Sequence, residues 1–510
     1  MNRRKQFIIN GLLITAVSLL IRSISVSFNV YISNRIGAVA MGLFTLISTV
    51  YGFAITVATS GIGFASTKMI ADALGESNDK GTVPSKSPVV SCIVKKCVFY
   101  ALSFSIGSAL ILLVSASTIG ERILKDARTV LPLQVLALTL PPIALSSVLS
   151  GYFTAVRRVY KNAIVQIAGQ LIRIYGCISL LAAIGANDIQ GACLAIVIGG
   201  AISEIGAFLI QYILYLLERR QRNGLIEKES LHIQKKLLHT ALPIAFSAYV
   251  RSGLITLEHM LIPWGLQRSG ASRDLSLAAY GTVHSMVFPL ILFPSALSGS
   301  FAGLLIPEVA ESLAQNDKAR IERIIDKVFH SALIFAVGTA GIMMCFSFPL
   351  ANVIYPNANA GKYILMIAPL IPVMYLDTSI DAILKGLGEQ VYCMGVNIAD
   401  ALLSVILVWL LLPNCGITGY IITVYFTETV NATLSITRLL TVTKVKPKLG
   451  LWLGKPLICI ILSTTAIRFF LNYSHTNLIS AWTLTGYILL TISIYLLLLL
   501  ATKTIRLSKK

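Results

Sequence analysis

Residues 42–74, GLFTLISTVYGFAITVATSGIGFASTKMIADAL, decide the fold of this chain. From Gly42 to Thr67 the stretch carries no charged side chain, and a helix rising 1.5 Å per residue needs about 20 apolar residues to cross a bilayer. The stretch also aligns without a gap on residues 281–313, where Ala-Asp-Ala-Leu at 71–74 falls on Ala-Glu-Ser-Leu at 310–313. One segment therefore predicts both a membrane span and an internal repeat.

The whole chain has the composition of a membrane protein. Of its 510 residues, 56% are hydrophobic and 13% are charged, and the mean hydropathy is +0.80, which lies outside the range of soluble chains. Long apolar runs favour helices, whereas a membrane barrel would show shorter alternating stretches. We therefore predict an all-α polytopic membrane protein with about fourteen transmembrane helices. The expected spans are 7–32, 42–70, 92–117, 130–155, 161–185, 191–217, 240–266, 277–305, 328–352, 361–384, 390–412, 417–439, 455–473 and 479–502.

The repeat predicts the organisation of these spans. Ser-Leu-Leu-Ile-Arg-Ser at 18–23 also matches Ser-Ala-Tyr-Val-Arg-Ser at 247–252, so the two halves are expected to be parallel six-helix repeats. The predicted parts are an N-lobe with helices 1–6, a cytoplasmic linker, a C-lobe with helices 7–12, and two extra transmembrane helices with a basic tail. Their expected bounds are 1–217, 218–239, 240–440 and 441–510.

The net charge of +20 is explained by topology. Of the 42 Lys and Arg residues, four fall within spans; if the amino terminus is cytoplasmic, 31 of the others lie on the inner side and 7 on the outer side. This asymmetry is the positive-inside rule. It predicts that both termini are cytoplasmic, and it argues against a nucleic-acid partner.

Three arginines near the middle of spans are the first candidates for a binding site. Arg22, Arg173 and Arg251 would each cost about 2.5–3.5 kcal/mol or more if they faced lipid. The repeat places Arg22 and Arg251 at matching depth, facing each other across a central cleft. Guanidinium forms paired hydrogen bonds with phosphate, which suits a pyrophosphate. The alternative is an internal ion pair, for example of Arg173 or Arg251 with Glu204 or Glu258.

Intramembrane carboxylates are candidates for ion coupling. The residues are Asp377, Asp381, Asp400 and Glu428. Oxygen ligands suit a hard ion such as Na⁺, and carboxylates also carry protons. The alternative is that Asp381 pairs with Lys385 one turn further on and that the others are hydrogen-bonded locally. We predict no cofactor or metal centre beyond such Na⁺ or H⁺ coupling.

The sequence offers no support for an enzyme. The motifs GxxxxGK[ST], HExxH and GxSxG are absent, so no catalytic residue is assigned. A membrane-embedded lipid-linked glycosyltransferase stays open as the rival from another class, although it normally needs an acidic metal or nucleotide site at a membrane face.

The chain resembles a known family in several diffuse motifs. These are the opening helix from Phe7 to Arg22, the stretch 42–74 with Ser-Gly-Ile-Gly at 60–63, its echo at 294–311, and Leu-Lys-Gly-Leu-Gly at 384–388. On these motifs the chain resembles the polysaccharide transporter and stage V sporulation protein B family of the multidrug/oligosaccharidyl-lipid/polysaccharide exporter superfamily, which is related to the lipid II flippases. The similarity covers nearly the whole chain.

The resemblance implies a function. Two lobes form a cleft that moves a polyprenyl-pyrophosphate-linked saccharide across the bacterial cytoplasmic membrane by alternating access, in cell wall or spore cortex synthesis, and the protein acts as a monomer. In such flippases arginines on the first helices of the lobes hold the pyrophosphate, and Arg22 and Arg251 match that description. Further cleft arginines usual in the second helix are missing here, where only Lys68 stands. A multidrug or cation antiporter of the same superfamily therefore stays open as an alternative.

Overall fold

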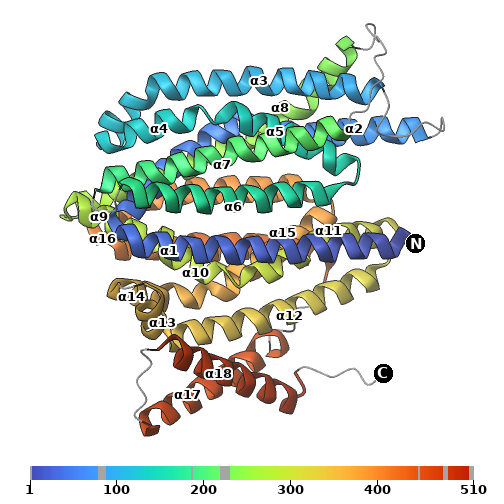
Figure 1. The fold of residues 1–510 in the computed structure, drawn as a ribbon. Helices are drawn as coiled ribbons and strands as arrows, with labels where there is room; N and C mark the ends of the chain where they lie inside the picture. The colour runs from blue at the N-terminus through green and yellow to red at the C-terminus, as the bar shows by residue number, and fades with distance from the viewer. Residues whose placement is uncertain are drawn as a thin grey trace. The chain divides into compact units, whose positions relative to one another are not determined.

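The computed structural model describes residues 3–78, 88–184, 188–218, 230–355, 357–445, 448, 450–474 and 480–504. Every regular element in this part of the chain is a helix (Figure 1), which confirms the predicted all-α membrane fold. Eleven of the helices are long and apolar enough to cross a membrane, or twelve if a pair bent by 44° at Leu138–Thr139 forms one span.

Two of the candidate spans are too long for a single crossing. They are Leu19–Gly75, which contains most of α1 (Arg3–Thr59) and of α2 (Ile62–Asn78), and Gln390–Thr443, which is α16. They run over 57 and 54 residues, roughly 85 and 80 Å of helix against about 30 Å of hydrocarbon. Helix α1 is broken at Gly37 with φ 79°, and α16 is broken at Gly416 with φ 56°. Glycine takes such backbone angles without steric cost. Counted as two spans each, these two candidates make the described part of the chain compatible with fourteen crossings.

By contacts the chain divides into two compact units. The N-unit contains residues 12–17 and 39–261, and the C-unit contains residues 1–11, 18–38 and 262–510. The first part of α1 thus belongs to the C-unit, and most of α8 (Ser230–Arg268) belongs to the N-unit. The predicted lobes 1–217 and 240–440 follow the chain, whereas the contact units exchange the first helix of each half.

The N-unit is built from eight further helical segments in the part of the chain that the structure describes. Buried side chains of α2, α3, α5, α7 and α8 form a hydrophobic core, and α6 and α7 lie side by side (Figure 1). The segments are α2 (Ile62–Asn78), α3 (Pro88–Ser117), the π-helix η2 (Thr118–Ile123), the 3₁₀-helix η3 (Ala127–Thr129), α4 (Val130–Ala137), α5 (Leu140–Ala155), α6 (Val159–Ile184) and α7 (Ile189–Glu218).

The C-unit contains the remaining helices. Its core lies between α11, α12, α15, α16 and η6. The segments are α9 (Arg273–Gly281), the π-helix η4 (Thr282–Val287), α10 (Phe288–Leu292), α11 (Ser295–Ala314), α12 (Lys318–Cys345), α13 (Ser347–Ile354), α14 (Ala358–Ile367), the 3₁₀-helix η5 (Ala368–Leu370), α15 (Ile371–Gly386), the π-helix η6 (Gly450–Gly454), α17 (Lys455–Ser474) and α18 (Ala481–Ala501).

Part of the predicted linker is helical, and the two extra helices pack within the C-unit. Helix α8 begins at Ser230, so residues 230–239 are helical rather than loop, and residues 219–229 lie outside the described part. The extra helices α17 and α18 are fixed to α12 through η6. There the buried indole of Trp452 donates to Oδ1 of Asp326 at 2.8 Å, and Lys448 lies 3.2 Å from Oδ2.

Each unit contains a glycine that allows two helices to approach closely. In the N-unit, a Cβ on Gly151 of α5 would lie 2.9 Å from the carbonyl oxygen of Gly63 in α2. In the C-unit, a Cβ on Gly386 of α15 would lie 2.9 Å from the carbonyl oxygen of Ile306 in α11. Small residues allow this close backbone approach, which stabilises helix pairs where lipid supplies no hydrophobic driving force.

An ion cluster around the buried carboxylate of Glu218 joins α6 to the end of α7. Glu218, whose side chain is 3% exposed, lies 2.6 Å from Nζ of Lys161 and 2.9 Å from Nη1 of Arg158. Lys161 also lies 5.1 Å from the ring centre of Phe153. Removing one member of a buried cluster leaves the remaining charges without compensation.

We therefore expect Glu218→Ala to lower the free energy of unfolding by about 3 kcal/mol or more. Glu311→Ala is the control, because Glu311 is 60% exposed and 3.7 Å from Arg320, and removing such a pair costs about 0–1 kcal/mol. Unfolding by SDS in mixed micelles measures both variants. Equal stability of the two variants would show that the cluster contributes no more than a surface pair.

Candidate functional site

Arg22 is held by a break in the helical run α9–η4–α10–α11. Its Nη2 donates to the carbonyl oxygen of Leu292 at 2.9 Å. Leu292 ends α10, and the amide of Ala296, which would pair with this oxygen in a continuous helix, donates to Phe293 instead. The released oxygen accepts a second bond, from the hydroxyl of Ser295 at 2.7 Å. The arginine thus satisfies a backbone group that has lost its helical partner.

Two asparagines hold the same part of α1 in the C-unit. Nδ2 of Asn29 donates to the carbonyl oxygen of Ser285 in the π-helix η4 at 2.6 Å. Nδ2 of Asn34 donates to the carbonyl oxygen of Ile354, the last residue of α13, at 2.8 Å. Polar side chains of α1 therefore bond backbone carbonyls at irregular points of neighbouring helices.

The guanidinium of Arg22 keeps most of its bonding capacity. A guanidinium has five N–H donors, and one hydrogen bond to a described residue is formed, while the side chain is exposed. Its charge also acts on Tyr375 of α15. The structure therefore presents an oriented cation inside a membrane-spanning segment, with donors left for an anion.

Arg251 occupies the corresponding place in the N-unit. Two residues beyond it, a Cβ on Gly253 would lie 3.5 Å from the ring of Phe53, and the repeat aligns Phe53 with Leu292. Helix α8 is held there by Tyr249, whose hydroxyl donates to Oγ of Ser60 at 2.6 Å. Arg251 is exposed and makes no hydrogen bond or ion pair within the described residues. The predicted face-to-face placement of Arg22 and Arg251 concerns two units and stays a prediction.

Arg173 lies in a different setting from the other two arginines. It is partly buried on α6 and interacts electrostatically with Glu204 of α7 and with Tyr51. No ion pair within 4 Å joins Arg173 and Glu204, and Nε of Arg173 is buried without a hydrogen bond to any described residue. Arg173 and Glu204 thus interact only over a longer distance than an ion pair, and the role of Arg173, in anion binding or in an internal pair, stays a prediction.

The four carboxylates fall into two groups. Asp381 lies 3.0 Å from Nζ of Lys385, its i+4 neighbour on α15, which confirms the alternative of a local pair. Asp377, Asp400 and Glu428 are partly buried in the C-unit. Over the described residues, no three His, Cys, Asp or Glu side chains are grouped so as to hold a metal ion. Coupling to Na⁺ or a proton stays a prediction.

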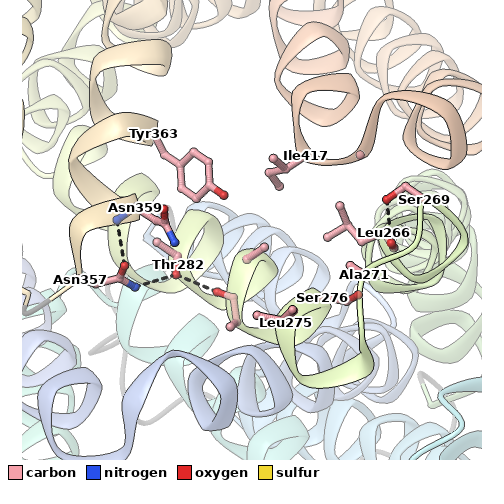
Figure 2. A pocket seen from close by; sticks show the side chains of 13 residues that line it. Leu266, Ser269, Ala271, Leu275, Ser276, Thr282, Asn357, Asn359, Tyr363 and Ile417 are labelled. Atoms are coloured by element: carbon pink, nitrogen blue, oxygen red, sulfur yellow. Dashed lines mark hydrogen bonds between the residues drawn. The ribbon is translucent and has the colours of Figure 1, made fainter.

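A cavity that the sequence did not indicate lies within the C-unit (Figure 2). It has a volume of about 300 Å³ and is formed where α8 ends, α9 and α14 begin, and α16 breaks at Gly416. We call it the neutral pocket, because none of its lining residues is charged; they are Leu266, Ser269, Ala271, Leu275, Ser276, Ala278, Ala279, Thr282, Asn357, Asn359, Tyr363, Gly416 and Ile417. A search for intramembrane charges misses such a site.

Comparison with known proteins identifies the family. The sequence profile of the polysaccharide biosynthesis protein family matches residues 8–268, and the MatE profile matches residues 269–410. Stage V sporulation protein B of Bacillus subtilis (strain 168) is 23% identical over 518 residues, which cover 99% of this chain and 96% of the relative. This is the family indicated by the motifs at 42–74 and 294–311.

Solved structures show the same fold. Lipid II flippase MurJ in an inward closed conformation matches with a TM-score of 0.70 and 12% identity, over 97% of this chain and 100% of that chain. An inward-facing multidrug resistance MATE transporter of the MOP superfamily matches with a TM-score of 0.63 and 13% identity, over 85% of this chain and 100% of that chain. The chain therefore belongs to the polysaccharide biosynthesis protein family and is a multi-pass membrane protein with the transporter fold of the MOP superfamily.

Proposed function

We propose that this protein is a flippase that moves a polyprenyl-pyrophosphate-linked saccharide across the cytoplasmic membrane of a bacterium. The observation that carries the proposal is the exposed guanidinium of Arg22, fixed to the carbonyl of Leu292 within a membrane span. The names of the relatives agree with it, since one is a lipid II flippase and another a sporulation protein. Lipid II-like precursors of cell wall or spore cortex are the substrates that we infer.

Arg22 recognises the part of such a substrate that changes least between saccharides. Pyrophosphate presents several anionic oxygens, and guanidinium binds a pair of them with two parallel hydrogen bonds. The bond to Leu292 fixes the arginine before the anion arrives, so less side-chain entropy is lost on binding. An anion also offsets the cost of holding this cation in a low-dielectric segment.

Arg251 supplies the second contact in this mechanism. It is the repeat equivalent of Arg22, and the two lie in different units. Alternating access requires groups from both units to engage one substrate, and a shared anion is a means of joining two cations that repel each other. Transport then needs no covalent step and no bound cofactor, and one chain is sufficient as a monomer.

The energy source that we infer is ionic. Asp377, Asp400 and Glu428 are partly buried carboxylates of the C-unit, and such groups bind Na⁺ or a proton when they change their exposure. Asp381 contributes less, because Lys385 already compensates its charge.

Transport of labelled lipid-linked precursor in reconstituted vesicles tests the function. We expect the double variant Arg22→Ala, Arg251→Ala to be nearly inactive. Arg22→Lys keeps the charge but loses the paired hydrogen bonds, so its rate should fall about tenfold or more, since a hydrogen bond to a charged group contributes about 1.5–3 kcal/mol. Arg35→Ala, an exposed arginine further along α1, is the matched control and should keep its activity.

A multidrug antiporter is the second candidate, because the MatE profile matches the second half and MATE transporters share the fold. The two candidates differ in the sign of the ligand charge. Resistance to cationic dyes that depends on Asp377 or Asp400 and is indifferent to Arg22, together with full precursor transport by the double variant, would contradict the flippase proposal.

Both termini are cytoplasmic in this proposal. Labelling of Cys415 tests this orientation of the chain in the membrane. Cys415 is the exposed one among the free cysteines, and it adjoins the break of α16 in a joint expected on the outer side. We expect an impermeant maleimide added to intact cells to label Cys415, and Cys415→Ser to abolish that labelling.

In the Cys415→Ser background, Lys318→Cys at the start of α12 should react only after the membrane is permeabilised. Labelling of Lys318→Cys from outside intact cells, with no labelling of Cys415, would reverse the proposed orientation.

A further inference from the structure

The neutral pocket is the feature of the C-unit that the proposed mechanism leaves unused. Its lining combines six neutral polar side chains with three branched apolar ones and contains no formal charge. Arg268 lies close to it in sequence but stacks on Trp264, with 4.7 Å between Cζ and the ring centre. A site without charge gives no advantage to an ion, so neither the pyrophosphate nor a coupling cation is its natural ligand.

Some polar groups of the pocket are available to a ligand. The side-chain amide of Asn359 and the hydroxyl of Tyr363 make no hydrogen bond to a described residue, although the Tyr363 side chain is only 8% exposed. Figure 2 shows both groups directed into the cavity. Asn359 is exposed, so its amide is open to water or a ligand, and the hydroxyl of a largely buried residue such as Tyr363 is normally satisfied by water or by a ligand.

Other polar groups shape the pocket without blocking it. Nδ2 of Asn357 donates to Oγ1 of Thr282 at 3.1 Å, which joins α14 to η4 across one wall. The hydroxyls of Ser269 and Ser276 donate to carbonyls of Leu266 and Ser272. A hydroxyl that donates in this way still has lone pairs that accept hydrogen bonds.

The size and the apolar walls restrict the ligand further. About 300 Å³ is the lower limit of ordinary small-molecule pockets, so it suits one ring rather than a drug-sized molecule. Leu266, Leu275 and Ile417 supply apolar surface beside the polar groups. A sugar ring has this combination, with C–H faces and a rim of hydroxyls, and it carries no charge.

The pocket lies on the same run of helix as the Arg22 contact. Thr282 begins η4 and Leu292 ends α10, ten residues later, which is about 15 Å along a helix axis. When the pyrophosphate is bound at Arg22, the sugar ring attached to it lies too close to Arg22 to enter the pocket. A ring further along the saccharide spans this distance.

We propose that the neutral pocket binds one uncharged sugar ring, with Tyr363 and Asn359 as its hydrogen-bonding residues. The inference rests on the proposed function, since the ring is a distal sugar of the lipid-linked saccharide. The neutral pocket thus selects the saccharide part of the substrate, whereas Arg22 and Arg251 select the pyrophosphate.

Saturation-transfer NMR on the purified full chain tests the proposal with soluble probes. The probes are N-acetylglucosamine, its cationic analogue glucosamine and the anionic glucuronate, each at millimolar concentration. We expect transfer to the neutral sugar and little to the charged ones. The double variant Asn359→Ala, Tyr363→Phe should bind the neutral sugar about tenfold or more weakly, because two hydrogen bonds are lost.

Matched controls keep the test decisive. Asn414→Ala and Tyr175→Phe change the same residue types outside the pocket, where Tyr175 is 77% exposed, and should leave transfer unchanged. Ala279→Phe fills the cavity and should abolish transfer, which covers the case in which the double variant misfolds. Equal transfer in the wild type, the double variant and Ala279→Phe, or none in the wild type, overturns the proposal.

The outcome is separable from that of the proposed function. Arg22→Ala should leave sugar transfer unchanged while it blocks precursor transport. If Arg22→Ala blocks transport but no sugar binds, the pocket proposal alone fails. If the neutral sugar binds but transport is indifferent to Arg22 and Arg251, the pyrophosphate mechanism fails and the sugar site stands.

Discussion

The hydrogen bond from Arg22 to the carbonyl of Leu292 is the contact on which the proposed site depends. Within a bilayer, an unpaired backbone carbonyl costs several kcal/mol, because no water reaches it. The break before Pro294 releases this carbonyl from the helical hydrogen bonds, and an arginine 270 residues earlier in the chain donates to it. The contact has two effects, since the released carbonyl gains a charged donor beside the hydroxyl of Ser295 and an intramembrane cation gains a fixed orientation.

The exchange of first helices follows from the same constraint. Helix α1 contributes Asn29 and Asn34 to carbonyls of the C-unit, and α8 contributes Tyr249 to the turn at Ser60 in the N-unit. Each half thus contains irregular helices whose polar groups are completed by the first helix of the other half. Broken helices are where transporters place their binding sites, and here the residues that complete them lie on the same helices as Arg22 and Arg251.

The sequence predicted the membrane fold well and the site in part. Apolar length and positive-inside asymmetry identify spans directly, and the repeat matched Arg22 to Arg251. The exchange of helices was not predictable, because the chain order gives no information on which half the first helix contacts. For Asp381 the sequence left open a role in ion coupling or a pair with Lys385. The structure shows the pair, which the i+4 spacing on one helix makes possible. The neutral pocket could not be predicted from the sequence, because Asn359 and Tyr363 are brought together with Gly416 only by folding.

Equilibrium binding of a polyprenyl diphosphate to the purified protein, compared with the monophosphate, tests the central claim that Arg22 holds the pyrophosphate. The account predicts that the diphosphate binds more tightly and that Arg22→Ala weakens its binding about tenfold or more, whereas Arg35→Ala leaves it unchanged. Diphosphate binding that is equally strong in Arg22→Ala and the wild type would contradict the account.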